Sequence, residues 1–326
     1  MLEVKLFGIG QAQFNQQPLI DFPNQQPSLL LCYLLINNRY PHHREHLSTI
    51  LGGDTSTRNA RKRLRNVLWR LRKTFQSVGM SLDDYLLVAE DTISFINSSN
   101  YWLDIEIFET KTEYCKDLSG REISPEQVSQ LEEAVNLYSG DLLESTYEDW
   151  VIYDREKYRI AHLNALNKLM VYHGLNGNYE RGLAYGENIL ARDSTREKVH
   201  RQMMWLYYLA GNRNAALTQY KRCCQTLMDE LGVYPMGETK YMHELILNNE
   251  FNAQSWLGNQ LTPIFPEKIT DRSIRPLVKR ALKKLNGLQE IIEGTSAELR
   301  LIEQKINEAM TESPPHKKVI PKRNQN

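Results

Sequence analysis

One stretch of the sequence, Thr57–Phe75, gathers cationic and amide side chains at helical spacing. It is TRNARKRLRNVLWRLRKTF, with eight Lys or Arg residues and no acidic residue. At about 100° per residue, the apolar side chains fall in one stripe and most polar side chains fall opposite it. The spacing therefore predicts a helix with one face on a core. The stripe consists of Ala60, Leu64, Val67, Leu68, Leu71 and Phe75.

The polar face of this predicted helix carries groups that bind phosphates and hydrogen-bond to base edges. Arg70 and Asn66 are the best candidates for base contacts, because they offer paired donors or a donor with an acceptor. The aromatic Trp69 is placed to pack on a thymine methyl or a sugar, or to shield a neighbouring loop. A basic helix that is only solvated is the alternative. The candidate DNA contacts are Arg58, Asn59, Lys62, Arg63, Asn66, Trp69, Arg70 and Lys73.

The segments around the basic helix favour the DNA-binding alternative. Two short strands come first, two helices precede the basic helix, and a hairpin with Glu90-Asp91 at its turn follows it. This order is typical of a winged helix-turn-helix whose third helix reads DNA. The strands are expected at Leu2–Gly8 and Ala12–Phe14, the helices at Ser28–Ile36 and Arg44–Leu51, and the hairpin at Tyr85–Val88 and Thr92–Phe95.

Composition indicates a folded protein of two or three domains, since 41% of its 326 residues are hydrophobic and 25% are charged. The net charge is zero but unevenly spread. Residues 1–82 hold eleven Lys or Arg against four Asp or Glu, a net of +7, and residues 83–160 hold six against nineteen, a net of −13. A basic head on an acidic body fits one part that touches nucleic acid and another that does not.

Neither export nor a membrane span is expected. The first residues, MLEVKLFG, lack the charged and apolar regions of a signal peptide, and no apolar run reaches the length of a membrane span. The four cysteines show no zinc spacing, so we expect reduced, packing residues and a cytoplasmic, nucleoid-associated protein.

No enzymatic motif stands out, and we expect no enzyme activity, no catalytic residues, no cofactor and no metal. His42-His43-Arg44-Glu45-His46 matches H-x-x-E-H, a zinc-protease pattern. Zinc binding would need both histidines on a stable helix and a third ligand. Pro41 stands beside the first histidine and the predicted helix is short, so a polar helix start is the preferred interpretation. Gly8-Ile9-Gly10 is followed by no helix, and no phosphate-binding loop motif occurs.

From about Asp104 to Leu247 the pattern is helical. Gly177-Asn178 recurs as Gly211-Asn212 after 34 residues, and Gly182 corresponds to Ala216. This period, with small residues where helices cross, is typical of tetratricopeptide repeats. Aromatic residues there are expected in the core rather than in a ligand groove. The helices are expected at Arg155–His173, Tyr179–Arg192, Glu197–Ala210 and Arg213–Leu231, with Asp117-Leu118 and Val135–Leu143 in earlier ones.

The end of the chain has a different pattern. Residues 251–271 are expected to be a linker, and residues 311–326 a basic disordered tail. Between them, residues 281–309 place apolar residues in strict four–three alternation, interrupted by Gly287 and Gly294. A helix over 272–310 forms either a dimeric coiled coil or a single helix docked on the last repeat.

Three strings carry a resemblance to a known family. They are Asn59–Arg72 of the basic helix, Leu137–Leu143 with Asp149–Val151 and Arg155-Glu156, and Ala210–Arg213 with Glu230–Pro235. Over residues 1–250 the sequence resembles the bacterial SARP-type transcriptional regulators, which join an OmpR-type winged helix to a bacterial transcriptional activation domain. The resemblance implies sequence-specific binding to double-stranded DNA, often at direct repeats, and contact with RNA polymerase, including its sigma factor.

The chain departs from this family in two places. Leu51-Gly52-Gly53 stands where members often have Trp-Pro, in a loop implicated in polymerase contact. The acidic hairpin tip, Glu90-Asp91, disfavours insertion into the minor groove, where Arg or Lys would be expected.

The sequence thus predicts a mainly α protein with a winged helix-turn-helix over residues 1–100 and a tetratricopeptide-like helical domain over residues 101–250. A C-terminal helix follows. The predicted function is a DNA-binding transcriptional activator that contacts RNA polymerase, as a monomer or a homodimer, away from membranes. The alternative is a tetratricopeptide scaffold or small-molecule sensor without direct promoter binding.

Overall fold

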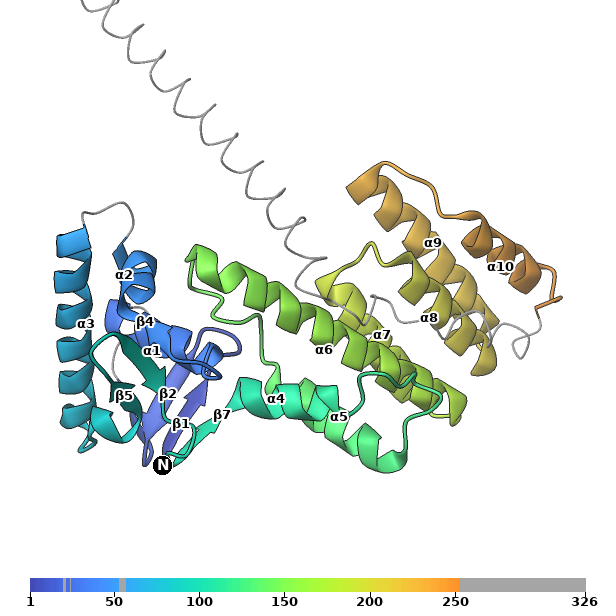
Figure 1. Cartoon of the computed structure of the whole chain (residues 1–326). Helices are drawn as coiled ribbons and strands as arrows, with labels where there is room; N and C mark the ends of the chain where they lie inside the picture. The colour runs from blue at the N-terminus through green and yellow to red at the C-terminus, as the bar shows by residue number, and fades with distance from the viewer. Residues whose placement is uncertain (20–21, 24, 53–56, 252–326) are drawn as a thin grey trace, which may run out of the picture. The chain divides into compact units, whose positions relative to one another are not determined.

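The structure is a computed structural model, and it describes residues 1–251 apart from residues 20–21, 24 and 53–56. The described part is mainly α-helical, with two small sheets near the N-terminus (Figure 1). We call residues 1–103 the head and residues 104–251 the body. No helix within the described ranges combines the length and apolar character needed to cross a membrane.

The first sheet of the head combines strands from the start of the head's sequence with one strand from its end. Its order is β3-β2-β1-β7, with β1 antiparallel to β2 and parallel to β7. Because β7 directly precedes the first helix of the body, the sheet of the head is complete only at residue 103. The strands are β1 (Leu2–Lys5), β2 (Gln11–Phe14), β3 (Gln17–Pro18) and β7 (Tyr101–Leu103).

The rest of the head is a winged helix-turn-helix. Helices α1 (Gln26–Ile36), α2 (Arg44–Gly52) and α3 (Thr57–Ser77) pack on one another. The second sheet, in order β4-β6-β5, forms the wing. Its strands are β4 (His42–His43), β5 (Leu86–Val88) and β6 (Thr92–Phe95), and a 3-10 turn at Leu82–Asp84 leads from α3 into it.

Helix α3 confirms the expected amphipathic helix. The six stripe residues, from Ala60 to Phe75, are all buried, with Phe75 fully inaccessible to solvent. All of them except Ala60 pack in the main core of the molecule with the apolar residues of α1 and α2. Burial of the Leu, Val and Phe side chains, at about 1.5–3 kcal/mol each, holds α3 against the core and leaves its opposite face toward solvent.

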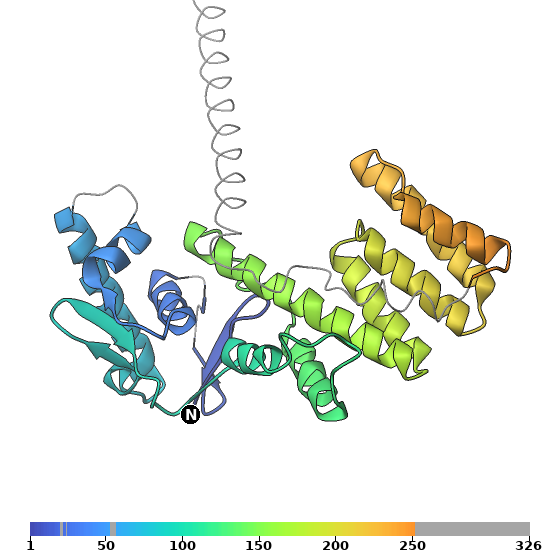
Figure 2. The ribbon, with the colours of Figure 1, turned by 45° about the vertical axis from the view of Figure 1, so that its right-hand side comes forward.

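The body is a row of helices. α4 (Asp104–Glu113) and α5 (Pro125–Leu137) precede two antiparallel pairs, α6 (Asp149–Leu175) with α7 (Tyr179–Arg192), and α8 (Glu197–Leu209) with α9 (Arg213–Leu231). α10 (Gly237–Leu247) follows. Figures 1 and 2 both place α9 against α8 and α10 against α9, as their contacts require.

Small residues set the spacing of the repeats, as the 34-residue period predicts. A methyl group on Gly182 would come 3.1 Å from the carbonyl oxygen of Met170 on α6. Its counterpart Ala216 is completely buried. Gly177 and Gly211 end their helices with φ of 78° and 75°, in the left-handed region that glycine tolerates best. Trp205 is buried and Tyr172, Tyr207, Tyr208 and Tyr220 are partly buried against these cores, as expected.

Several expectations about local structure were wrong. Asp117-Leu118 lies in the turns between α4 and α5, and α5 ends at Leu137, so residues 138–143 form a loop rather than a helix. His42 and His43 belong to β4 rather than to a helix start, and β7 was not expected. The four cysteines are free, as expected. The expectations for residues 252–326 (linker, C-terminal helix and tail) lie outside the described residues.

Candidate nucleic-acid interface

The exposed face of α3 holds most of the candidate DNA contacts. Asn59, Lys62, Asn66, Trp69, Arg70 and Lys73 are exposed, and Arg63 is half-buried. Of Arg58 the structure describes the helical backbone position but not the side chain. The candidates therefore share one helix face, but some of their polar groups bond to neighbouring residues and others do not.

Two of the candidate DNA contacts, on one flank of α3, hydrogen-bond to neighbouring residues. The Arg70 guanidinium donates to Oε1 of Gln25 at 2.5 Å, in the segment before α1. The Arg63 guanidinium donates to the carbonyl oxygen of Leu51, near the end of α2, at 3.1 Å. Arg63 thus links α3 to α2, and a base contact by Arg70 would have to replace its bond to Gln25.

The opposite flank of α3 is also occupied. Arg61 pairs with Glu45 of α2 at 2.5 Å, and Arg72 pairs with Asp83 at 2.7 Å. Both pairs are solvent-exposed, so each contributes little to stability, typically below about 1 kcal/mol. Their effect is to direct these two cations away from the middle of the face.

The middle of the face is formed by Lys62, Asn66, Trp69 and Lys73. Among the described residues, no carboxylate lies within ion-pair distance of Lys62 or Lys73, and Asn66 has no hydrogen-bond partner. The Trp69 side chain is 58% exposed, and Nζ of Lys73 lies 6.0 Å from its ring centroid. More than half of the Trp69 side chain is therefore accessible to solvent.

Arg65 is a further exposed cation that the sequence analysis did not single out. It lines a groove of about 830 Å³ between α3 and the wing, together with Arg44, Arg61 and Leu64. The wing contributes Glu90 and Asp91 to the same groove. Helical spacing alone would have found Arg65, because it lies one turn from Lys62 and Trp69 on the edge of the polar face.

The wing carries no cation at its tip. The backbone N–H of Ala89 donates to the carbonyl of Thr92, which closes the hairpin around the exposed Glu90 and Asp91. The N–H of Arg44, at the start of α2, donates to the carbonyl of Asp91 at 2.9 Å and anchors the hairpin. An anchored acidic tip is poorly suited to the phosphate-lined minor groove.

The H-x-x-E-H string does not form a metal site. His42 lies on β4 and bonds through Nε2 to the carbonyl oxygen of Asn37 at 2.8 Å. His46 lies on α2 and bonds through Nε2 to the hydroxyl of Tyr33 at 3.0 Å. Within the described ranges, no three His, Cys, Asp or Glu side chains converge as metal ligands.

The head is joined to the body by a buried carboxylate. Asp104, the first residue of α4, is only 2% exposed. Its oxygens accept the backbone N–H groups of Leu6, Phe7 and Ile105 at 2.8–3.0 Å. Burial raises the pKa of Asp104, and the backbone N–H groups oppose that rise.

The loop after α5 completes this joint. The N–H groups of Leu143 and Glu144 donate to the carbonyls of Leu6 and Gly8, so the loop pairs with the segment that directly follows β1. Arg155 of α6 holds the loop by donating to the carbonyls of Leu142, Leu143 and Thr146 at 2.6–2.8 Å. The string Leu137–Leu143 with Arg155 thus serves to attach the body to the head.

A comparison with protein families identifies the body. The family model "bacterial transcriptional activator domain" matches residues 103–247, which begin at the joint and end with α10. Residues 103–247, which are nearly the whole body, therefore resemble that domain. A comparison with curated proteins gives no match.

A solved structure supports the fold of the head and the body. EmbR of Mycobacterium tuberculosis, solved in complex with a low-affinity phosphopeptide, matches with a TM-score of 0.58 and 21% identity. The match covers 80% of this chain and 69% of the EmbR chain. At this identity the match supports the common fold of head and body.

Proposed function

We propose that the chain is a transcriptional activator, rather than an enzyme, that binds duplex DNA through α3 and contacts RNA polymerase through the body. It would act in the cytoplasm at the nucleoid. The observation that carries the DNA part is the exposed strip of Lys62, Asn66, Trp69 and Lys73, whose polar groups have no hydrogen bond or ion pair to another described side chain. The proposal includes a homodimer, because the heptad pattern of residues 281–309 is typical of a coiled coil.

In this arrangement α3 lies in the major groove with Asn66 facing the bases. An Asn side chain pairs with the N6 and N7 atoms of adenine, and Lys62 and Lys73 are spaced to reach phosphates on either side. Trp69 would pack on a sugar or a thymine methyl. The family match and the position of α3 as the third helix of the head support this orientation.

The first prediction separates base contact from phosphate contact. Asn66→Ala is expected to weaken binding to the cognate site by about 1–2 kcal/mol and to relax selectivity at one base pair. Lys73→Ala is expected to weaken binding to all sequences alike and to reduce the salt slope by about one. Gel-shift titrations at several salt concentrations, on a site mapped by genome-wide binding, measure both effects.

Arg72→Ala is the matched control, because it removes one positive charge from the neighbouring residue. Its guanidinium points to Asp83 rather than into the strip, so it should change affinity less than Lys73→Ala. If Lys62→Ala, Asn66→Ala and Lys73→Ala all bind the mapped site as wild type does, α3 is not the helix that reads DNA.

The second prediction separates DNA binding from polymerase contact. A full-length variant with Lys62, Asn66 and Lys73 all changed to Ala is expected to lose promoter binding and transcription activation. It should still bind RNA polymerase holoenzyme in the absence of DNA, because the body is unchanged. Fluorescence titration and transcription with purified components measure the two activities. Failure of the wild-type chain to bind holoenzyme would contradict the polymerase part and leave the DNA part standing.

A further inference from the structure

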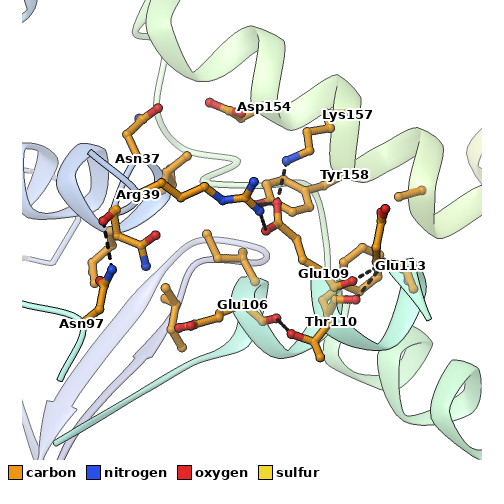
Figure 3. A pocket seen from close by; sticks show the side chains of 18 of the residues that line it. Asn37, Arg39, Asn97, Glu106, Glu109, Thr110, Glu113, Asp154, Lys157 and Tyr158 are labelled. Atoms are coloured by element: carbon orange, nitrogen blue, oxygen red, sulfur yellow. Dashed lines mark hydrogen bonds and ion pairs between the residues drawn. The ribbon is translucent and has the colours of Figure 1, made fainter. Parts of the chain in front are cut away.

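A cavity of about 920 Å³ lies where head and body meet (Figure 3). The loop after α1 lines it with Asn37 and Arg39, α4 with Glu106 and Glu109, and α6 with Asp154 and Lys157. This volume is in the range of small-molecule sites in proteins. The α3 surface contributes no residue to its lining.

Most of the charged groups around this cavity already have partners. Glu109 accepts Nζ of Lys157 at 2.5 Å, the hydroxyl of Tyr158 at 2.9 Å and the guanidinium of Arg39 at 3.4 Å. Glu106 accepts the hydroxyl of Tyr101 at 2.7 Å. Glu113 accepts Nζ of Lys116 at 2.8 Å. These contacts fix the walls of the cavity.

Asp154 is different. It is half-buried, and among the described residues it has neither a hydrogen-bond donor nor an ion-pair partner. Figure 3 shows its carboxylate near Lys157, whose ammonium is bonded to Glu109 instead. The lining holds four carboxylates, Glu106, Glu109, Glu113 and Asp154, against three cations, Arg39, Lys116 and Lys157. The lining thus carries one excess negative charge, and among its four carboxylates Asp154 is the one for which the described residues provide neither a hydrogen bond nor an ion pair.

A partly buried carboxylate without a partner costs folding free energy. Burial raises the pKa of Asp154 to about 6, with nearby Glu109 adding to the rise and Lys157 opposing it. At neutral pH the group is nevertheless mostly ionised. A bound cation would supply the donors that the protein itself does not provide.

We propose that this cavity binds a small organic cation, an amine or guanidine, whose charged end pairs with Asp154. A planar guanidinium or an ammonium offers several donors to one carboxylate. The amide and hydroxyl groups of Asn37, Asn38 and Thr110 offer polar contacts to the rest of the ligand. Since the lining comes from head and body together, the ligand would contact both.

A metal ion fits this site less well than an organic cation. Glu109, a neighbouring carboxylate, is already paired with Arg39 and Lys157, and no three metal-ligating side chains converge within the described ranges. An anion is disfavoured by the unpaired negative charge of Asp154. The size of the cavity also exceeds what one ion requires.

The probes for the test are agmatine and spermidine, titrated calorimetrically into the full-length chain at 150 mM NaCl without DNA. We expect saturable binding with one site per chain for at least one probe. Asp154→Asn should weaken that binding at least tenfold. Asp149→Asn is the matched control, since it removes the same charge from an exposed position on the same helix, and it should bind as wild type does.

Three results would overturn the inference. They are the absence of saturable binding for both probes, equal binding by Asp154→Asn and wild type, and competition by Mg²⁺ at concentrations equal to the probe. Thermal unfolding of each variant shows whether it is folded before titration. Because no DNA is present, the result does not depend on the function proposed for α3.

Discussion

Replacing Asp104 with alanine is expected to lower the free energy of unfolding by about 3–5 kcal/mol. The substitution leaves the N–H groups of Leu6, Phe7 and Ile105 buried without their acceptor. Each unsatisfied buried donor costs about 1–3 kcal/mol. Urea unfolding followed by circular dichroism measures the loss, and the midpoint should fall with little change in slope.

Glu106→Ala is the control for this change. Glu106 is also in the first turn of α4, but it is exposed and accepts only the hydroxyl of Tyr101. Its loss should cost under about 1 kcal/mol. If Asp104→Ala costs no more than Glu106→Ala, the carboxylate does not hold the joint.

The joint connects the head and the body through apolar as well as polar contacts. The core of the head continues into the body through Phe7, whose ring contacts the rings of Phe108, Tyr138 and Tyr158. Asp104 and the loop held by Arg155 supply the polar part of the same connection. The acidic body is thereby kept beside a basic head without needing DNA to unite them.

The helices of this chain could be predicted from sequence because their signals are long and periodic. α3 spans more than five turns with a continuous stripe, and Gly177 and Gly211 mark the ends of two repeat helices. Arg44–Leu51 and Tyr179–Arg192 were predicted to within one residue. For such segments the local pattern and the tertiary packing agree.

Elements defined by distant partners could not be predicted in this way. β7 has three residues and exists because it pairs with β1, about a hundred residues earlier in the chain. The apolar residues Tyr138, Leu142 and Leu143 suggested helix, but they are buried because their loop packs on β1. A short segment of this kind carries no periodicity that distinguishes the two structures.

The exposed strip of α3 was predicted only in outline for a related reason. A helical projection shows that Arg63, Arg65 and Arg70 are polar, but not which neighbours approach them. Leu51 and Gln25 engage Arg63 and Arg70, whereas Arg65 faces the groove beside the wing. Similarly, the position of Asp154 in a cavity could not be predicted, because its environment is assembled from the loop after α1, α4 and α6.

Asp154→Asn is expected to stabilise the protein at pH 7 by about 2–3 kcal/mol, the opposite sign to Asp104→Ala. The pKa of Asp154 is raised from 3.8 to about 6 in the folded protein. Between these values the folded protein retains a proton that the unfolded chain has released, so this group's contribution to stability falls as pH rises. The destabilisation caused by ionised Asp154 is almost complete above pH 6, and it disappears below pH 4.

The test is therefore the difference between variant and wild type measured at several pH values, since other carboxylates contribute to both. The stabilisation by Asp154→Asn should be near zero at pH 4 and should grow through pH 5 to a plateau above pH 6.5. Asp149→Asn, on the exposed first turn of α6, should show no such growth. A pH-independent difference would mean that Asp154 titrates normally and carries no cost. With an amine or guanidine bound to the ionised carboxylate, the wild type should recover most of this deficit at pH 7, and Asp154→Asn should gain nothing from the same ligand.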